Sequence, residues 1–437
     1  MKARPTMLHS VILLLTSMLF GLCSASAQLA TLGDASFVTY PQPLLRHVES
    51  WRNQQSAEAQ RPSTYIEIDQ LAFYDNIRLV KTRILDDATR LMVVIKSDAY
   101  GHGLELLGNV AEIAGADYFG ITENSSIVTM RSMGLETPIL RLRLASNAEL
   151  EAVHLNPDVY GSVEEMVGNL QMVQLLSSIG ERQGQRIKIH VNLNTGGMSR
   201  NGFDMNVPEI REQMLTLLKL TGIEVAGIMT HFPNADADDI GETRTALANF
   251  EEQASWIIEN GGLIRGDILL HAANTSATLR LPESHLDMVR VGSLVFGERL
   301  EVEAPEALEQ LMSVYSRVGQ INFYPRGSSV GYGGSYTLQR DSFLANIPIG
   351  KNNGIPRDLV EVLIGGNRYP TVGSMSMNTT MIDITDGRDG IASGDRVVIF
   401  GRQAQDEIRV EEHWRSLISD IHSYMGQLNQ RARYSTP

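Results

Sequence analysis

Short apolar runs that alternate with stretches of helical periodicity are the feature that most limits how this chain can fold. Near-continuous apolar strands followed by amphipathic helices indicate a parallel sheet covered on both faces, and many such units predict a (β/α)8 barrel of the TIM type. Nine runs compete for eight places, so one of them, with 65–68 as first choice, lies outside the barrel or is not a strand. The nine runs are 65–68, 91–95, 118–121, 138–144, 158–161, 187–193, 225–229, 267–270 and 288–291.

The pattern changes in the last third of the chain. After about residue 311, long helical periodicity disappears and short strands separated by glycine-rich turns follow. A chain of 437 residues also exceeds the size at which single cores stop growing, about 250–300 residues. We therefore predict a barrel domain at 62–310 and a mostly β C-terminal domain at 311–437, preceded by a polar lead-in segment at 28–61.

The charge of the chain narrows the classes of partner. It carries 51 acidic and 37 basic side chains, a formal net charge of -14. Such a surface lacks the positive field that attracts phosphate backbones, so nucleic-acid binding is not expected and small molecules are the favoured partners.

The segment 1–27 has the pattern of a secretory signal peptide. Lys2 and Arg4 precede an apolar run at 11–22, and small residues follow. The run is shorter than the roughly 20 residues that a membrane-spanning helix needs, so we predict cleavage before Gln28, export to the periplasm and no membrane anchor. Cleavage would remove Cys23, the only cysteine in the sequence. Disulfides, cysteine nucleophiles and thiolate metal sites are then excluded, and no metal site is predicted.

A lysine directly after a predicted buried strand is the first candidate catalytic residue. Lys96 follows the apolar run 92–95, and barrels of this type place their active sites at the carboxyl ends of their strands. Partial burial there would lower the pKa of the amine enough to make it a nucleophile or a base. From position alone, a lysine that only extends its charge to solvent is an equally good interpretation.

The residues around Lys96 decide between these interpretations. VIKSDAYGHG at 94–103 resembles the pyridoxal phosphate lysine motif of the alanine racemase family. The resemblance covers most of the chain from Tyr65 onward, and it implies a pyridoxal 5′-phosphate-dependent racemase that acts on free amino acids. Further segments that resemble family motifs follow in family order: NTGGMSRNG at 194–202, MTHF at 229–232, HAANT at 271–275, VRVG at 289–292, VGYG at 330–333 and SMN at 376–378.

The resemblance implies two acid/base residues on opposite faces of the cofactor. The α-proton of a free amino acid is too weak an acid for a side chain alone to remove, so the cofactor, held as a Schiff base by Lys96, acts as the electron sink. Racemisation then needs a proton removed on one face and returned on the other, and Lys96 and Tyr332 resemble that pair. In the family the tyrosine comes from the neighbouring subunit, which implies a homodimer with shared active sites.

Further residues resemble the family's cofactor ligands. Arg290 resembles the partner of the pyridine nitrogen, which a guanidinium leaves unprotonated, and His231 resembles the residue that orients Arg290. The residues alone leave open that Arg290 is a structural ion pair and that His231 is a core histidine. The residues that resemble ligands of the phosphate are Tyr100, Thr275 and the backbone amides around Gly292 and Ser293.

Substrate-binding residues are implied by the same resemblance. Arg200 resembles the arginine that contacts the cofactor's phenolic oxygen and the substrate carboxylate. Met377 resembles the residue whose backbone N–H lies near that carboxylate. Asn201 and Asn378, which follow these two residues in the sequence, complete the predicted substrate site.

Several positions depart from ordinary alanine racemases. Asn192 stands where those enzymes carry a carbamylated lysine, Asn378 replaces an aspartate, and Ala432 replaces a tyrosine that narrows the entrance. Smaller or uncharged groups at the mouth should admit longer side chains. These changes, together with Arg141 and Arg143, are similar to the periplasmic broad-spectrum amino-acid racemases. The roles of the two arginines stay open.

We therefore expect a broad-specificity racemase for amino acids without β-branches, including alanine and basic amino acids such as lysine and arginine. A narrower racemase for alanine, or for lysine and arginine, is the alternative. A decarboxylase of the related barrel-plus-β fold would typically use a cysteine at the substrate, which the exported chain lacks. A noncatalytic cofactor-binding barrel would lack Tyr332 and the second domain.

Overall fold

A computed structural model describes residues 39–53, 61–197, 201–299, 303–355, 359–413 and 433–435 of the chain. The predicted signal peptide at 1–27, Arg200 and Ala432 lie outside these residues. Within the described part of the chain, no helix is both long and apolar enough to cross a membrane. A first helix, α1 (Gln42–Asn53), lies in the predicted lead-in segment.

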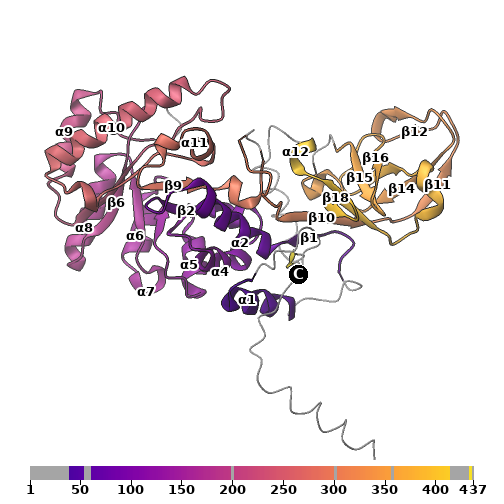
Figure 1. Cartoon of the computed structure of the whole chain (residues 1–437), viewed down its shortest axis with the longest axis horizontal. Coiled ribbons are helices and arrows are strands. Elements are labelled where there is room, and N and C mark those ends of the chain that lie inside the picture. The colour runs from indigo at the N-terminus through magenta and orange to yellow at the C-terminus, as the bar shows by residue number, and fades with distance from the viewer. Residues whose placement is uncertain are drawn as a thin grey trace, which may run out of the picture. The chain divides into compact units, whose positions relative to one another are not determined.

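Eight parallel strands form a nearly closed barrel, which confirms the predicted fold (Figure 1). Their order in the sheet is β8-β7-β6-β5-β4-β3-β2-β9. Hydrogen bonds close the remaining gap between β8 and β9, since the N–H of Arg290 donates to the carbonyl of Ala273 at 3.0 Å. The strands are β2 (Arg90–Val94), β3 (Tyr118–Ile121), β4 (Ile139–Arg141), β5 (Glu164–Val167), β6 (Ile187–Asn192), β7 (Ile223–Met229), β8 (Leu269–His271) and β9 (Met288–Val291).

Helices connect these strands, and several begin at side-chain caps. Ser146 and Glu149 form a capping box at the start of α6, and Asp69 accepts hydrogen bonds from the first backbone N–H groups of α2. The helices are α2 (Gln70–Leu79), continued by the π-turn η2 (Val80–Ile84), α3 (Lys96–Tyr100), α4 (Leu104–Ala114), α5 (Asn124–Ser132), α6 (Asn147–His154), α7 (Pro157–Tyr160), α8 (Leu170–Gln183), α9 (Pro208–Leu217), α10 (Gly241–Gly261) and α11 (Thr275–Arg280).

Two of the nine segments predicted as strands are not barrel strands. The run 65–68 is strand β1 (Tyr65–Ile68), and as expected it lies outside the barrel. The predicted strand at 158–161 is wrong, because Pro157 begins the short helix α7 there and Gly161 ends it with a positive φ of 65°. The fourth barrel strand is β5, which the sequence did not predict, because its first two residues, Glu164 and Glu165, are charged.

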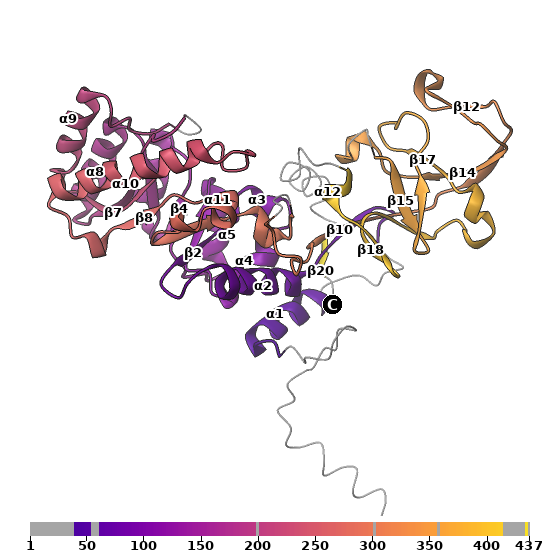
Figure 2. The same ribbon diagram turned by 45° about the horizontal axis from the view of Figure 1, so that its top comes forward.

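The C-terminal part is mostly β, as predicted (Figure 2). A seven-stranded sheet has the order β16-β15-β18-β10-β1-β20, with β19 paired to β18, so that β1 joins this sheet through antiparallel pairing with β10. Two smaller sheets are β11-β14-β17 and β12-β13. The strands are β10 (Met312–Arg317), β11 (Ile321–Tyr324), β12 (Ser329–Val330), β13 (Tyr336–Thr337), β14 (Ser342–Ile347), β15 (Glu361–Ile364), β16 (Asn367–Pro370), β17 (Thr380–Asp383), β18 (Arg396–Gln403), β19 (Asp406–Ile408) and β20 (Arg433–Ser435), with helix α12 (Val410–His413) before the last.

Candidate active site

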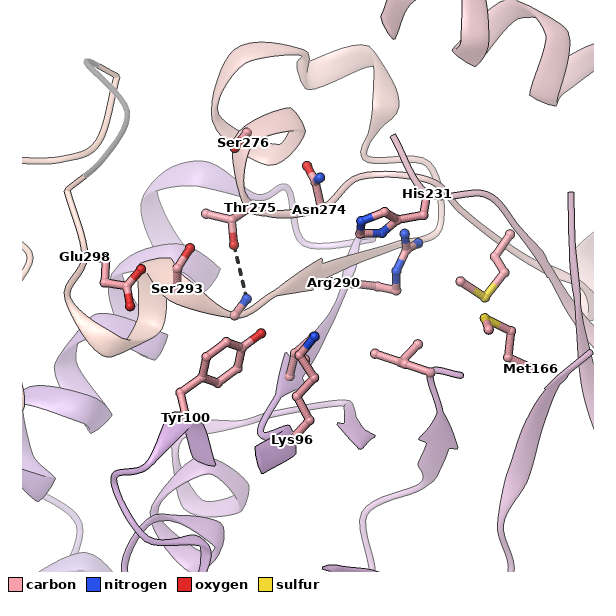
Figure 3. A pocket seen from close by; sticks show the side chains of 14 residues that line it. Lys96, Tyr100, Met166, His231, Asn274, Thr275, Ser276, Arg290, Ser293 and Glu298 are labelled. Atoms are coloured by element: carbon pink, nitrogen blue, oxygen red, sulfur yellow. Dashed lines mark hydrogen bonds between the residues drawn. The ribbon is translucent and has the colours of Figure 1, made fainter. Parts of the chain in front are cut away.

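A cavity of about 270 Å³ lies at the carboxyl ends of the barrel strands (Figure 3). Strands β2, β5, β7 and β9 all contribute to its wall, through Val94, Met166, Met229 and Arg290. Carboxyl ends of strands are where barrels of this type place their chemistry. Seven of the residues that the sequence predicted for the site line this one cavity, namely Lys96, Tyr100, His231, Thr275, Arg290, Gly292 and Ser293.

The segment after Lys96 is a left-handed turn. Ser97, Asp98, Ala99 and Tyr100 all have φ between 52° and 56°, a conformation that costs L-residues roughly 1–2 kcal/mol each. The Asp98 carboxylate accepts a hydrogen bond from the N–H of Leu104 at 2.8 Å, and this contact helps to hold the turn. The turn brings the Tyr100 ring to 5.8 Å from the Lys96 Nζ. The sequence did not predict this strained backbone, because none of the four residues is glycine, the residue type that most often marks a positive φ.

One corner of the cavity gathers hydroxyl and N–H groups. The N–H of Gly292 donates to Thr275 Oγ1 at 3.2 Å, and Ser293 follows on the same turn. A Cβ atom at position 292 would lie 2.7 Å from the Tyr100 hydroxyl, so only glycine lets that hydroxyl approach the backbone here. Clustered hydroxyls and a backbone N–H are donors that suit a phosphate group.

Arg290 is held in the wall by hydrogen bonds to barrel backbone. Its Nη1 donates to the His271 carbonyl at 2.9 Å, and its Nη2 donates to the carbonyls of Thr230 and Ala272 at 2.7 and 3.0 Å. Nη1 also lies 3.1 Å from Nδ1 of His271. Burial above all, together with the charge of Arg290, lowers the pKa of His271 well below its ordinary value, so this imidazole is neutral.

His271 is therefore a site residue whose role sequence reasoning missed. It stands in the segment 271–275, but the sequence assigned the orientation of Arg290 to His231. His231 lines the same cavity (Figure 3), and its predicted role stays a prediction. A histidine at the end of a buried strand, next to a strand that carries a buried arginine, is the signal that could have found His271.

Arg141 and Arg143 point away from the cavity. Leu140 belongs to the barrel core and Leu142 lines the cavity, so the arginines on alternate positions face the helices. Fully buried Arg141 places its Nε 3.1 Å from Glu165 Oε2, and Arg143 pairs with both carboxylate oxygens of Glu149 on α6.

The predicted residues of the C-terminal part are exposed. Tyr332 is 73% exposed and Met377 is 54% exposed, and neither they nor Asn378 line the cavity. A bridge between Gly331 and Ser374 joins the two loops that carry them. Together these residues form a separate group on the surface of the β domain.

Two more predicted positions lie on the loop after β6. Asn192, at the end of that strand, is buried, and its Nδ2 donates to the Asn201 carbonyl at 2.7 Å. Asn201 itself is exposed and does not line the cavity. Arg200 lies outside the described residues.

Comparisons with known proteins agree with this geometry. The family model described as alanine racemase, N-terminal domain, matches residues 68–300, and the one described as alanine racemase, C-terminal domain, matches residues 311–434. A broad specificity amino-acid racemase of Aeromonas hydrophila is 38% identical over 84% of this chain and 89% of its own length. A lysine racemase of Proteus mirabilis is 37% identical over 84% of this chain and 89% of its own length.

A solved structure has the same architecture. An alanine racemase of Clostridium difficile superposes with a TM-score of 0.75 at 26% identity. The superposition covers 86% of this chain and 96% of that one.

Proposed function

The chain belongs to the alanine racemase family, and from that premise we propose that it is a broad-specificity amino-acid racemase. It is an isomerase that depends on pyridoxal 5′-phosphate. The substrates we propose are several amino acids without β-branches, including alanine, lysine and arginine. The observation that carries the proposal is the single cavity that unites Lys96, Arg290 and the donors around Thr275.

The residues of the cavity fit the cofactor. The amine of Lys96 suits its aldehyde, the hydroxyls of Tyr100 and Thr275 with the N–H of Gly292 suit its phosphate, and Arg290 suits its ring nitrogen. When bound, the cofactor supplies the electron sink that makes the α-proton of an amino acid removable. The space that the absent Cβ of residue 292 leaves is part of this fit.

Two side chains move the proton in our proposal. Lys96 Nζ takes or returns it on one face of the substrate, and the hydroxyl of Tyr332 does so on the other face. Arg290 keeps its own proton, so it holds the ring without competing in these transfers. Arg200 pairs with the substrate carboxylate, assisted by the Met377 loop.

The exposure of Tyr332 supports a homodimer. Tyr332 and Met377 are among the most exposed large apolar side chains of the described residues, with Phe323 at 53% and Tyr336 at 38% on the same domain. Exposed apolar groups of this kind are typical of surfaces that bind a partner. We propose that a second copy of the chain covers them and that each copy lends Tyr332 to the other's cavity.

A broad substrate range is supported by the walls of the cavity. Met166, Met229 and Leu142 line it, and methionine is an unbranched, adaptable side chain that accommodates different shapes. Asn192 and Asn378 stand where the family carries a carbamylated lysine and an aspartate, and smaller or uncharged groups at the mouth should admit longer side chains. The names of the relatives from Aeromonas hydrophila and Proteus mirabilis agree with this range.

The test is a panel of single enantiomers with the purified protein and pyridoxal phosphate. Chiral chromatography should detect racemisation of alanine, lysine, arginine and methionine, and little of valine. Turnover of alanine alone, or of lysine and arginine alone, would establish the narrower alternative. Strong turnover of valine would contradict the exclusion of β-branched side chains.

We also propose that the protein acts in the periplasm. The support is the sequence of residues 1–27, with its basic start and its short apolar run. Fractionation of cells that express the chain should release it with the periplasmic contents, shortened at its amino terminus. Full-length protein in the cytosolic fraction would refute this.

A further inference from the structure

The interior of the barrel holds a row of polar side chains among apolar ones. Core residues such as Met92 and Met288 are fully buried there. His271 and His190 also have no exposed surface, and Glu164 is 5% exposed. Polar groups in such a core are costly unless they are hydrogen bonded, so this row has a structural or functional reason.

Consecutive members of the row are hydrogen bonded. His271 Nδ1 lies 3.1 Å from Arg290 Nη1, and His271 Nε2 lies 2.8 Å from His190 Nδ1. His190 Nε2 lies 2.7 Å from Glu164 Oε2. The other oxygen of Glu164 is 3.7 Å from the half-exposed Lys188 Nζ. The row therefore runs from the arginine of the cavity to the amino end of the barrel.

Chemistry fixes the direction of every bond in the row. A guanidinium only donates, so Nδ1 of the neutral His271 accepts and its proton lies on Nε2. That proton is donated to His190 Nδ1, which leaves the His190 proton on Nε2, where it is donated to Glu164. Burial raises the pKa of Glu164, but the hydrogen bond from His190 and the charge of nearby Lys188 hold it below its ordinary value, so Glu164 is a carboxylate.

The barrel wall is shaped around the His190 ring. A Cβ atom at Gly227 on β7 would lie 2.2 Å from His190 Nδ1, and the register of β6 against β7 shifts between Ile189 and His190. Tyr118 packs its ring edge-on to His190. Only a glycine opposite and a local irregularity in the pairing make room for this imidazole in the row.

We propose that Glu164 and His190 are positioning residues, which select the tautomer of His271 and so keep a hydrogen-bond acceptor facing Arg290. With the other tautomer, a His271 N–H would face the N–H of Arg290, and the guanidinium would keep only its bonds to backbone carbonyls, with a repulsive contact in place of the bond to His271. This inference rests on the proposed function, in which Arg290 faces the ring nitrogen of the cofactor.

The next residue on the same strand is a matched control. Glu165 has no exposed surface, and it faces the other side of β5, where it accepts from His154 Nε2 at 3.0 Å and pairs with Arg141. Loss of either glutamate therefore removes a buried carboxylate from β5. Only the loss of Glu164 changes the row.

The decisive measurement is NMR of the protein with isotope-labelled histidine rings, with and without pyridoxal phosphate. Wild-type His271 and His190 should both carry their protons on Nε2. Glu164→Leu removes the acceptor that selects this state, so a second tautomer of His271 should appear. Glu164→Gln keeps an acceptor oxygen and should keep the wild-type spectrum, and Glu165→Leu should keep it too.

Kinetics complete the test. Glu164→Leu should lower kcat by about 10- to 100-fold on alanine and lysine alike, as loss of a residue that supports a ligand commonly does. Glu164→Gln should restore most of this loss, and Glu165→Leu should leave kcat near the wild-type value. A wild-type His271 proton on Nδ1, or an unchanged tautomer and kcat in Glu164→Leu, would overturn the inference.

The two proposals fail separately. The tautomers are read in the cofactor-free protein, so they do not depend on racemisation. Absence of any racemase activity in wild type with the expected tautomers would refute the proposed function alone. Normal racemisation with the opposite His271 tautomer would refute the positioning role alone.

Discussion

The predicted active-site residues fall into two groups with opposite environments. Arg290 in the barrel is 4% exposed and its guanidinium is fixed by hydrogen bonds, whereas Tyr332 on the β domain is 73% exposed. Lys96 is partly buried and stands next to four residues with strained backbone. The barrel group, which includes Lys96 and Arg290, is held in place by contacts within one chain. The exposed group, which includes Tyr332, lies on the surface of the β domain, where a partner could contact it.

This difference separates two tasks of the proposed reaction. The barrel group binds the cofactor and needs its donors fixed beforehand, which burial and backbone hydrogen bonds provide. In the proposed dimer, the exposed group contributes the second acid/base residue, and it acts only after a second copy of the chain places it against the cavity. Loss of a barrel residue should therefore remove the cofactor, while loss of an exposed residue should leave the cofactor bound and stop the reaction.

The largest effect is expected for Lys96→Ala. The variant loses both the amine that holds the cofactor and one of the two acid/base groups, so racemisation should fall by about 10⁴-fold or more. The visible absorbance of the bound cofactor should change as well, because the covalent attachment is gone. Lys219→Ala, at an exposed amine after α9, is the control and should keep both colour and rate. If the Lys96→Ala variant kept its racemase activity, the proposed role of Lys96 in cofactor attachment and proton transfer would be wrong.

Tyr332→Phe should separate the two tasks. Cofactor absorbance should remain, while kcat falls by about 10²- to 10⁴-fold because one proton-transfer group is lost. Tyr336→Phe, at an exposed tyrosine nearby, is the control and should keep most activity.

Mixing two inactive variants tests whether the site is shared. Tyr332→Phe and Lys96→Ala subunits, unfolded and refolded together, should form mixed dimers that each contain one intact site. Random pairing should then restore about a quarter of wild-type activity, because half of the dimers are mixed. If one chain supplied both residues to its own site, mixing would restore nothing.

The sequence predicted the barrel group better than the strands that carry it. Lys96 follows an apolar run that is typical of a buried strand, and the family motif around it led to the other predicted ligands. Strand β5 was missed because Glu164 and Glu165 are charged, and charged residues are rarely buried without partners. Their partners, His190 and Arg141, lie on other strands, so only the fold reveals that the glutamates are satisfied.

Roles that depend on long-range contacts were also beyond the sequence. His271 and Arg290 are 19 residues apart, and nothing local marks their hydrogen bond. The left-handed turn at 97–100 has no local signal either, because none of its four residues is glycine. The exposure of Tyr332 depends on how the loops of the β domain pack, which no motif encodes.

A similar contrast exists between Arg141, which is buried on β4, and Arg143, which is partly exposed just after this strand. Here the contrast concerns the free energy of unfolding. Arg141→Met would leave Glu165 as a buried, partly unpaired carboxylate, so the free energy of unfolding should fall by about 3–5 kcal/mol. The Nη atoms of Arg141 meet no acceptor among the described residues, so the pair is not fully satisfied. Replacement of both partners, Arg141→Met with Glu165→Leu, should therefore recover much of the loss in urea denaturation. A double variant less stable than Arg141→Met would contradict this reasoning.

Loss of Arg143, the more exposed of the two arginines, should have the smallest effect on the free energy of unfolding, and the effect should be larger at neutral than at acidic pH. The hydrogen bonds of Glu149 with Arg143, then with the Ser146 backbone, lower the pKa of Glu149 from its ordinary 4.5 to about 2. A carboxyl whose pKa falls on folding stabilises the protein above its unfolded pKa, and that contribution is lost as the pH falls towards the folded value.

Arg143→Met should thus cost at most about 1 kcal/mol near neutral pH, because the pair is partly exposed. Urea denaturation at about pH 6 and about pH 3 should show the gap between wild type and Arg143→Met narrowing at the lower pH, since pH 3 lies below the unfolded pKa of Glu149 and part of the contribution is then lost. A gap as large as that of Arg141→Met, or one that widens on acidification, would show that Arg143 is not the surface counterpart described.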